Sequence, residues 1–210
     1  MRKWTAKDYR TMPWKNGGGS TTELAIFPEG AGMDHFVWRL STATVAQDGP
    51  FSHFAQIDRS LAILTGAGLV LKTDTGSVAE KMTSLTQESL PHRFFGEDNI
   101  FAELIDGTVV DLNLMTRRDV CQHYMQRLSA GQHLIHAEDA QQVLVFCEKG
   151  RAQLLNQTSL EAGELVLLEE EHEASGVRCH IEAEEASLLY VMRISFLNYP
   201  AQHGGLHAVS

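Results

Sequence analysis

The stretch Phe36-Val-Trp-Arg-Leu-Ser-Thr-Ala-Thr-Val45 decides the fold class of this chain. It is rich in aromatic and β-branched residues, and two different sets of side chains alternate along it with a period of two. This pattern is typical of a β-strand whose two faces meet different surroundings. A second stretch, Val109-Val-Asp-Leu-Asn-Leu-Met-Thr116, shows the same alternation. Together they predict a sheet with one aliphatic face and one polar face.

Short apolar runs continue through the rest of the chain, separated by turns that contain glycine. No long amphipathic helix is evident. Many short strands at regular spacing predict an all-β protein, either a sandwich or a barrel. The runs are Leu61–Leu64, Gly68–Leu71, Val143–Cys147, Ala152–Leu155, Leu165–Leu168, Val177–Ile181 and Leu188–Ile194.

The two halves of the chain also resemble each other. Leu61–Leu71 and Val143–Leu154 each read as an apolar strand, a glycine turn and a second strand. Each pair precedes a final apolar strand that ends in arginine, at Arg117 and at Arg193. This repeat, at a spacing of about 80 residues, predicts two stacked barrels, residues 1–118 and residues 119–210.

Composition excludes some classes of function. The 210 residues include 17 Lys and Arg against 27 Asp and Glu, a net charge of −10, and no basic cluster that would bind nucleic acid. No apolar run is long enough to span a membrane. Cys121, Cys147 and Cys179 form no CxxC pair and read as reduced structural thiols. With no apolar leader at the N-terminus, these features predict a cytoplasmic protein.

A glycine-rich motif, Pro13-Trp14-Lys15-Asn16-Gly17-Gly18-Gly19, marks the first candidate site. Trp14 offers an apolar face, Lys15 a cation, and Asn16 both a donor and an acceptor. Consecutive glycines leave bare backbone N–H groups that can cradle an anion. The motif therefore points to a small-molecule site; the alternative is a solvated glycine-rich loop.

Strand alternation supplies the second candidate site. Arg39 and Ser41 share one face of their strand, and Asp111 and Asn113 share one face of theirs. If the aliphatic faces pack against another sheet, these polar side chains line the lumen of a barrel. Buried charges must be paired or must meet a ligand. The alternative is that Arg39 and Asp111 face water or pair with each other.

Two further residues are candidates near this lumen. Arg59 could bind a carboxylate with its two-pronged guanidinium group, or it could form an ion pair within the protein. His92 precedes Phe94-Phe95 and could act in the cavity as an acid or base, or simply pack among the aromatic rings. Asp58 is expected to cap a turn.

The histidines argue against a metal centre. Phe51-Ser-His53 contains one histidine and no His-x-His, and residues three apart such as His133 and His136 lie on opposite faces of a strand. His172 lies in an acidic turn, and His203 and His207 lie in a glycine-rich tail. We therefore expect no metal and no cofactor.

Several motifs in fixed order resemble the HutD/Ves family. They are Pro13–Gly19 with Thr22-Glu23, Trp38-Arg39-Leu-Ser41, Asp48-Gly-Pro-Phe-Ser52, Asp58-Arg59-Ser-Leu61 and Asp111–Arg117. The resemblance runs through the N-terminal half and continues more loosely to about residue 196. It implies a bicupin, with two double-stranded β-helix (jelly-roll) barrels in one chain. HutD members accompany histidine-degradation genes and Ves takes its name from environmental stress, but neither association names a chemistry.

Together these features predict a metal-free bicupin that binds a small anionic metabolite, a carboxylate or formyl compound, in a regulatory or stress-related role. The second barrel would be mainly structural or would form a homodimer surface. One alternative is an enzyme, either a metal-independent isomerase or lyase that uses Lys15 or His92 for proton transfer, or a metal hydrolase. Another is an interaction protein with a vestigial cavity. The expected ligand-binding residues are Trp14, Lys15, Asn16, Gly17, Gly18, Arg39, Ser41, Arg59, His92 and Asn113; the sequence identifies neither the ligand nor a catalytic residue.

Overall fold

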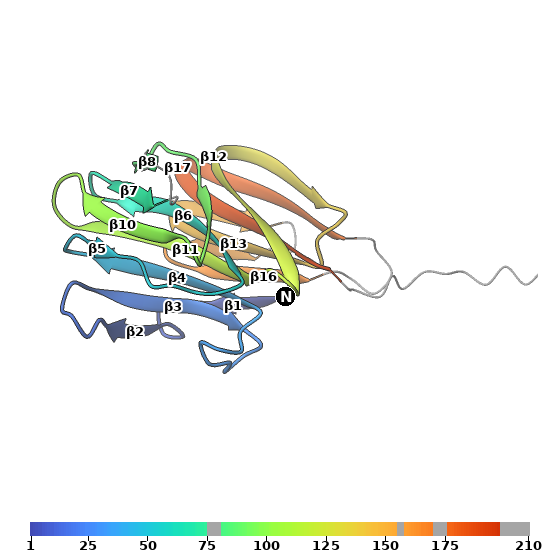
Figure 1. Ribbon diagram of the computed structural model, residues 1–210. Coiled ribbons are helices and arrows are strands. Elements are labelled where there is room, and N and C mark those ends of the chain that lie inside the picture. The colour runs from blue at the N-terminus through green and yellow to red at the C-terminus, as the bar shows by residue number, and fades with distance from the viewer. Residues whose placement is uncertain (75–80, 155–157, 170–175, 198–210) are drawn as a thin grey trace, which may run out of the picture.

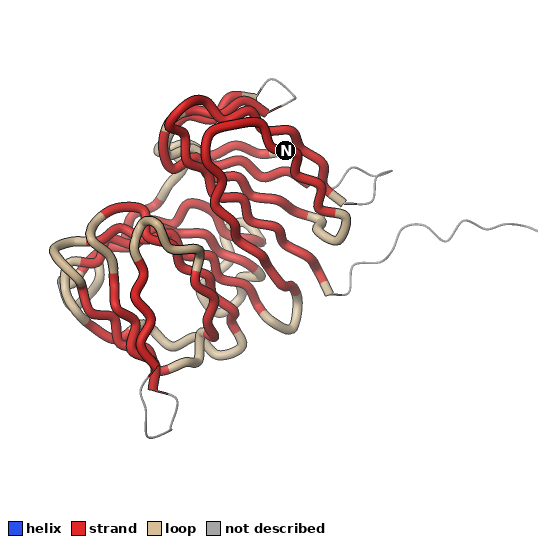
Figure 2. The backbone as a smooth tube through the Cα atoms, turned by 90° about the horizontal axis from the view of Figure 1, so that it is seen from above, coloured by secondary structure: helices blue, strands red, loops and turns tan. Residues whose placement is uncertain are grey.

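The computed structural model describes residues 1–74, 81–154, 158–169 and 176–197, and these residues form seventeen strands and no helix (Figure 1). The all-β prediction is therefore confirmed. Figure 2 shows the strands gathered in two groups that lie side by side.

The N-terminal half consists of two sheets. The larger has the order β2-β3-β4-β11-β6-β9, and the smaller has the order β5-β10-β7-β8. The six strands of the larger sheet are β2 (Arg10–Pro13), β3 (Gly19–Phe27), β4 (Trp38–Val45), β11 (Val109–Arg117), β6 (Ile57–Thr65) and β9 (His92–Phe95). The four strands of the smaller sheet are β5 (Gly49–Pro50), β10 (Asn99–Leu104), β7 (Leu69–Asp74) and β8 (Lys81–Leu85).

The C-terminal half is one seven-stranded sheet with the order β1-β16-β13-β17-β14-β15, in which β12 also pairs with β17. Its first strand comes from the other end of the chain, because Arg2 of β1 pairs with Leu167 of β16. The strands are β1 (Arg2–Trp4), β16 (Leu165–Glu169), β13 (Gln142–Lys149), β17 (Val177–Phe196), β14 (Arg151–Leu154), β15 (Ser159–Glu161) and β12 (Cys121–Ala137).

One apolar core joins the two halves. The aliphatic faces of β4 and β11, which carry Leu40 and Leu114, pack in the same cluster as Leu144 and Met192 of the C-terminal sheet. The polar faces of β4 and β11 consequently turn inward, into the N-terminal half. Strand alternation thus predicted correctly which side chains of β4 and β11 share the aliphatic face. A separate apolar cluster fills the C-terminal half, and another fills part of the N-terminal half.

Buried hydrogen bonds add to this contact. The indole Nε1 of Trp38 donates to Oε1 of Gln142 at 2.7 Å. The ring of His123 lies between the hydroxyl groups of Ser60 and Thr116, at 2.8 and 2.6 Å. Burial lowers the pKa of His123 to about 4, so the ring is neutral at physiological pH. The two halves therefore form one packed unit.

The three cysteines are all free and buried, as the sequence indicated. Burial raises the pKa of Cys121 to about 12, and those of Cys147 and Cys179 to about 11. Thiols of this kind are poor nucleophiles. Among the described residues there is no helix that could cross a bilayer.

Candidate functional site

A cavity of about 550 Å³ opens in the N-terminal half, between the large sheet and the segment from Gln47 to Phe54. This volume suits a small metabolite. Eight of the ten expected ligand-binding residues line it, while Gly17 and His92 do not. The eight are Trp14, Lys15, Asn16, Gly18, Arg39, Ser41, Arg59 and Asn113.

The floor of the cavity consists of residues that lie opposite one another on the paired strands β4, β11 and β6. Met115 of β11 pairs with Arg39 on β4 and with Arg59 on β6, so two arginines flank one methionine. Adjacent strands lie about 4.8 Å apart, so the two arginine backbones are about 10 Å apart. Asn113 and Asp111 follow on the same face of β11. Two cations and two hydrogen-bonding side chains therefore converge on one polar floor.

Arg39 has an ionic partner within the protein. Its Nε donates to Oε2 of Glu23 on β3 at 2.7 Å, and the Arg39 side chain is almost fully buried. Its Nη1 lies 3.5 Å from the Ser41 hydroxyl oxygen, a long and weak contact. Arg39 thus neither faces water nor pairs with Asp111. Its charge is neutralised by a carboxylate that is itself partly exposed.

Arg59 lacks such a partner. It is 6% exposed, and its guanidinium carbon lies 5.1, 5.7 and 4.8 Å from the ring centres of Phe51, Phe54 and Phe94. Its one hydrogen bond among the described residues runs from Nη1 to the carbonyl oxygen of Ser52 at 3.4 Å, and its buried Nε has no partner. Burial lowers its pKa to about 10, so Arg59 remains charged at neutral pH.

Two buried acceptors face the same floor. Asp111 is 3% exposed, and the Oδ1 atoms of both Asp111 and Asn113 have no partner in the described part of the chain. Burial raises the pKa of Asp111 to about 7, while the charge of Arg59 and a hydrogen bond from the Ala43 backbone oppose that rise. A buried polar group without a partner costs about 1–3 kcal/mol. These atoms are therefore ready to bind a polar ligand.

The glycine-rich loop closes the hairpin between β2 and β3 differently from our expectation. The N–H of Gly17 donates to the Trp14 carbonyl at 3.1 Å, and the N–H of Gly18 donates to Oδ1 of Asn16 at 3.1 Å. Gly17 has a φ of 71°, which the turn requires. Because these two amides are satisfied within the loop, they do not form the open anion cradle that the sequence suggested.

Trp14 forms a fixed wall of the cavity. Its Nε1 donates to the hydroxyl of Thr21 at 2.8 Å. Its ring lies directly over Gly19, where a Cβ atom would come within 3.0 Å of the ring and 2.1 Å of the Thr44 carbonyl oxygen. Gly19 is therefore needed for the close approach of β3 to β4 and for the position of the indole.

We expect Gly19→Ala to destabilise the protein by about 1–3 kcal/mol, because the new methyl group overlaps backbone. Urea denaturation followed by fluorescence measures this change. Gly32→Ala is the matched control, because no atom lies within 4 Å of its added Cβ. Equal stabilities of the two variants would contradict the close packing at Gly19.

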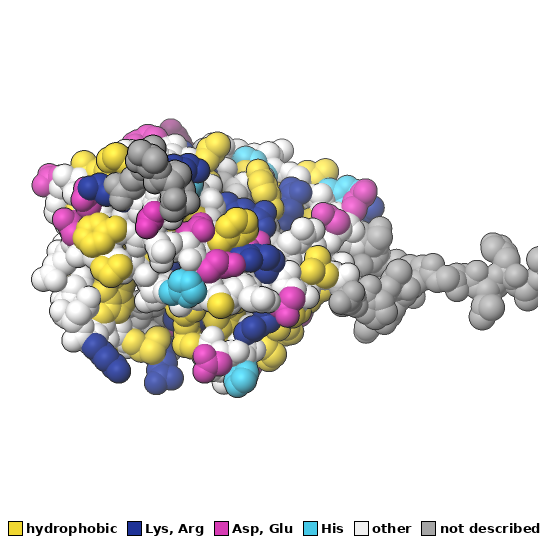
Figure 3. All heavy atoms as spheres, viewed as in Figure 1, with side chains coloured by type: hydrophobic (Ala, Val, Ile, Leu, Met, Phe, Trp, Pro, Cys, Tyr) yellow, Lys and Arg dark blue, Asp and Glu magenta, His cyan; other side chains and the backbone are white. Residues whose placement is uncertain are grey.

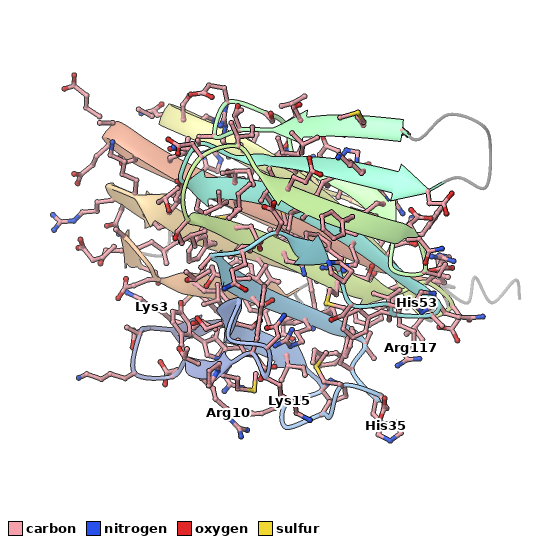
Figure 4. All side chains as sticks on the ribbon, turned by 60° about the vertical axis from the view of Figure 1, so that its left-hand side comes forward. Lys3, Arg10, Lys15, His35, His53 and Arg117 are labelled. Carbon is pink, nitrogen blue, oxygen red and sulfur yellow. The ribbon has the colours of Figure 1, made fainter. Side chains whose placement is uncertain are left out.

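The remaining expected residues lie at the edge of the cavity or beyond it. His92 stacks on Phe94 with ring centres 6.1 Å apart, and burial lowers its pKa. Lys15 is exposed, and Figure 4 shows it with Arg10 and His35 along one side of the molecule, all pointing outward. Lys and Arg side chains are visible along the same lower edge, near β2, in Figure 3.

The cavity does not suit a metal ion. In the part of the chain that the structure describes, its lining contains two arginines and two aspartates, Asp48 and Asp111, but no histidine, cysteine or glutamate. Two guanidinium groups on the floor would repel a cation. Within the described ranges there is no group of three His, Cys, Asp or Glu placed to hold a metal. His172, His203 and His207 lie outside the described residues.

Sequence reasoning missed three contributors. Glu23 neutralises Arg39, and Phe51 and Phe54 enclose Arg59. Glu23 and Phe51 lie within the motifs that carry the family resemblance, whereas Phe54 lies between two of them, and the sequence alone does not show which arginine each side chain contacts. Only the pairing of β3 with β4, and the fold of the segment before β6, brings them there.

Comparisons with known proteins agree with the resemblance. A family model described as HutD matches residues 6–190. An uncharacterized 21.2 kDa protein from the hutC 3′ region of Pseudomonas putida is 38% identical over 110 residues, which are 52% of this chain and 55% of that protein. Protein Ves of Cronobacter sakazakii is 38% identical over 118 residues, 54% of this chain and 61% of that protein. The matched part thus spans little more than half of each curated relative.

Solved structures agree over a longer range. HutD from Pseudomonas fluorescens SBW25 has a TM-score of 0.77 and 28% identity, covering 93% of this chain and 98% of that one. An oxalate decarboxylase from Bacillus subtilis has a TM-score of 0.63 at 7% identity, covering 93% of this chain and 77% of that one. The second likeness concerns the fold alone and confirms the cupin architecture.

Proposed function

This chain belongs to the HutD family, and on that premise we propose that its N-terminal barrel, which lies within residues 1–118 and excludes β1, binds a small anionic metabolite without a metal ion. The ligand class is a carboxylate or a formyl compound. Residues 119–210 support this barrel structurally. Binding without turnover would allow the protein to act in a regulatory or stress-related role, by responding to the level of the metabolite.

The observation that carries the proposal is the state of Arg59. A guanidinium group that is buried and charged, with no carboxylate within ion-pair distance in the described residues and only a longer-range interaction with Asp111, has lost its hydration without full compensation. An entering carboxylate would accept from Nε and restore the lost hydrogen bond and the lost counter-charge. The three phenyl rings around Arg59 hold its fork in place before the ligand arrives.

The charges around the cavity favour the same class of ligand. Arg39 is balanced by Glu23, and at the opening the exposed Lys15 adds a positive charge while the exposed Asp48 adds a negative one. The charge of Arg59, which Asp111 balances only in part near neutral pH, is therefore the attraction for an anion within the cavity. Oδ1 of Asn113 has no hydrogen-bond partner among the described residues. A ligand that satisfies this atom therefore carries a hydrogen-bond donor in addition to its carboxylate.

The enzymatic alternative finds less support in this geometry. His92 lies outside the cavity and Lys15 is exposed at its rim, so neither is placed to exchange a proton with a molecule on the cavity floor. The described residues of the lining also include no histidine or cysteine. Binding therefore explains the arrangement better than proton transfer by these two residues.

Formate is the simplest probe, and the HutD structure from Pseudomonas fluorescens SBW25 was obtained in a formate condition. We expect sodium formate and sodium acetate to raise the melting temperature of the protein in a concentration-dependent way. Sodium chloride at the same ionic strength is the control. If neither carboxylate stabilises the protein beyond the chloride control, the proposed function is wrong.

We expect Lys15→Ala to weaken formate binding by only about two- to fivefold, because Lys15 is exposed and its charge is screened by water and salt. Isothermal titration at low and high salt measures the change, which should shrink as salt rises. Lys7→Ala removes an exposed lysine away from the cavity and should leave affinity unchanged. A loss that is independent of salt would instead indicate a direct contact.

A further inference from the structure

Asp111 is the buried carboxyl group of the cavity, and its role is not explained by anion binding alone. We propose that the cavity binds its anionic ligand together with one proton, which is taken up from solvent by the carboxyl group of Asp111. The neutral carboxyl group then donates its O–H to an oxygen atom of the ligand. This inference rests on the proposed function of the cavity and specifies how that site responds to pH.

The position of Asp111 supports this role. It lies on β11 between Ala43 of β4 and Ile63 of β6, on the face that lines the cavity. No ion pair within 4.0 Å involves it in the described part of the chain, although Arg59 stabilises its negative charge from a longer distance. Its Oδ1 is buried and has no hydrogen-bond partner among the described residues. A residue that lines the cavity therefore carries a carboxyl oxygen that is not yet satisfied.

The charged groups around Asp111 come from several elements and from the rim of the cavity. Arg59 faces it from β6, and Arg39 of β4 is paired with Glu23 of β3. Lys15 lies at the rim. Asp48 also lines the cavity, but it is exposed and accepts a hydrogen bond from the backbone of Leu104. Among the residues that the structure describes, no other titratable side chain lines the cavity, so Asp111 is the group there that can change charge near neutral pH.

Electrostatics explains why binding of an anion favours protonation of Asp111. Before binding, Arg59 supports the Asp111 carboxylate against the cost of burial, and the pKa of Asp111 lies at about 7. A second anion in the same cavity draws on the same guanidinium group and repels the carboxylate. Both effects raise the pKa of Asp111 further. Protonation removes the repulsion and turns an acceptor into a donor, with no other bond formed or broken.

The coupling has a clear signature. Below the pKa of the free protein Asp111 already carries the proton, so affinity does not depend on pH. Above it, each binding event must take a proton from solvent, and the dissociation constant rises by up to about tenfold per pH unit. This rise continues until pH exceeds the pKa of Asp111 in the complex.

The test is isothermal titration of the full chain with sodium formate from pH 6 to pH 9, in pairs of buffers with different ionisation enthalpies. Formate stays ionised throughout. We expect the dissociation constant of the parent to rise toward tenfold per pH unit above pH 7, with uptake of close to one proton near pH 8. Asp111→Asn should bind formate with little dependence on pH. Asp106→Asn, at an exposed loop outside the cavity, should behave as the parent.

Several outcomes would overturn the inference. Formate binding by the parent with no pH dependence contradicts it but leaves the proposed function intact, whereas no formate binding at any pH contradicts both. If the dissociation constant of Asp111→Asn still rises with pH as in the parent, another group takes up the proton and the inference is wrong. Infrared difference spectra of the parent at pH 8 provide a check without any variant. Formate should produce the band of a protonated carboxyl group, and its absence would reject the proposal.

Discussion

Arg59→Met is expected to weaken formate binding by about 10- to 100-fold. The variant loses a charged hydrogen bond worth about 1.5–3 kcal/mol, and 1.4 kcal/mol corresponds to a factor of ten. Methionine is apolar and flexible, so it fills the space among Phe51, Phe54 and Phe94. Titration at pH 6, where Asp111 is mostly protonated, isolates the contribution of the guanidinium group.

Two variants make this result specific. Arg59→Lys keeps the positive charge but loses the two-pronged geometry, so its affinity should fall between those of the parent and Arg59→Met. Arg10→Met removes an exposed arginine of β2 that lies outside the cavity, and it should bind formate as the parent does. If Arg59→Met retains the parent's affinity, the anion does not bind at Arg59. The buried charge of Arg59 would then no longer support the proposed function.

The polar floor of the cavity could be predicted from sequence because strand alternation is a local property. Leu40 and Leu114 belong to the aliphatic faces of β4 and β11. The period of two then places the polar side chains on the opposite faces, namely Arg39, Ser41, Asp111 and Asn113. The structure places all four on the lining of one cavity. No knowledge of distant contacts was needed for that step. Whether these residues bind a ligand is a separate question, which the titrations above address.

The partners of these residues could not be predicted, because they depend on register between strands. Glu23 reaches Arg39 across a β-bulge that lies between Glu23 and Ala25. A one-residue change of register would turn Glu23 to the other face. The prediction that the N–H groups of Gly17 and Gly18 are free to bind an anion is wrong for a related reason. The side chain of Asn16 folds back on its own loop, and composition does not show that preference.

The pairing of β1 with β16 was also beyond the sequence pattern. A strand of three residues, Arg2–Trp4, is too short to show a period, and its partner lies at the other end of the chain. Similarly, the pattern left His92 free to face the cavity or to pack on Phe94, and the pairing of β9 with β6 decides between them. Non-local pairing, rather than local preference, sets these positions.

Trp38→Ala is expected to cost about 3–5 kcal/mol of the free energy of unfolding, the range for truncating a large buried aromatic side chain. Trp38 is 1% exposed and lies in the apolar core that joins the two halves. Its ring stacks on Phe27 with centres 5.8 Å apart, and its Nε1 donates to Gln142. The variant loses both contacts and leaves the buried amide of Gln142 without its indole partner. Urea denaturation measures the change.

The same variant tests whether one face of β4 contributes to the stability of the fold and the other face to binding of the anion. Trp38 and Arg39 are neighbours on β4 but face opposite sides, so below its melting temperature Trp38→Ala should still bind formate with an affinity close to the parent's. Trp14→Ala is the matched control, because Trp14 is only partly buried and lines the cavity. Trp14→Ala should lower the free energy of unfolding less than Trp38→Ala does, and it should weaken formate binding more. The reverse pattern would mean that the core between the halves, rather than the polar floor, controls access to the anion.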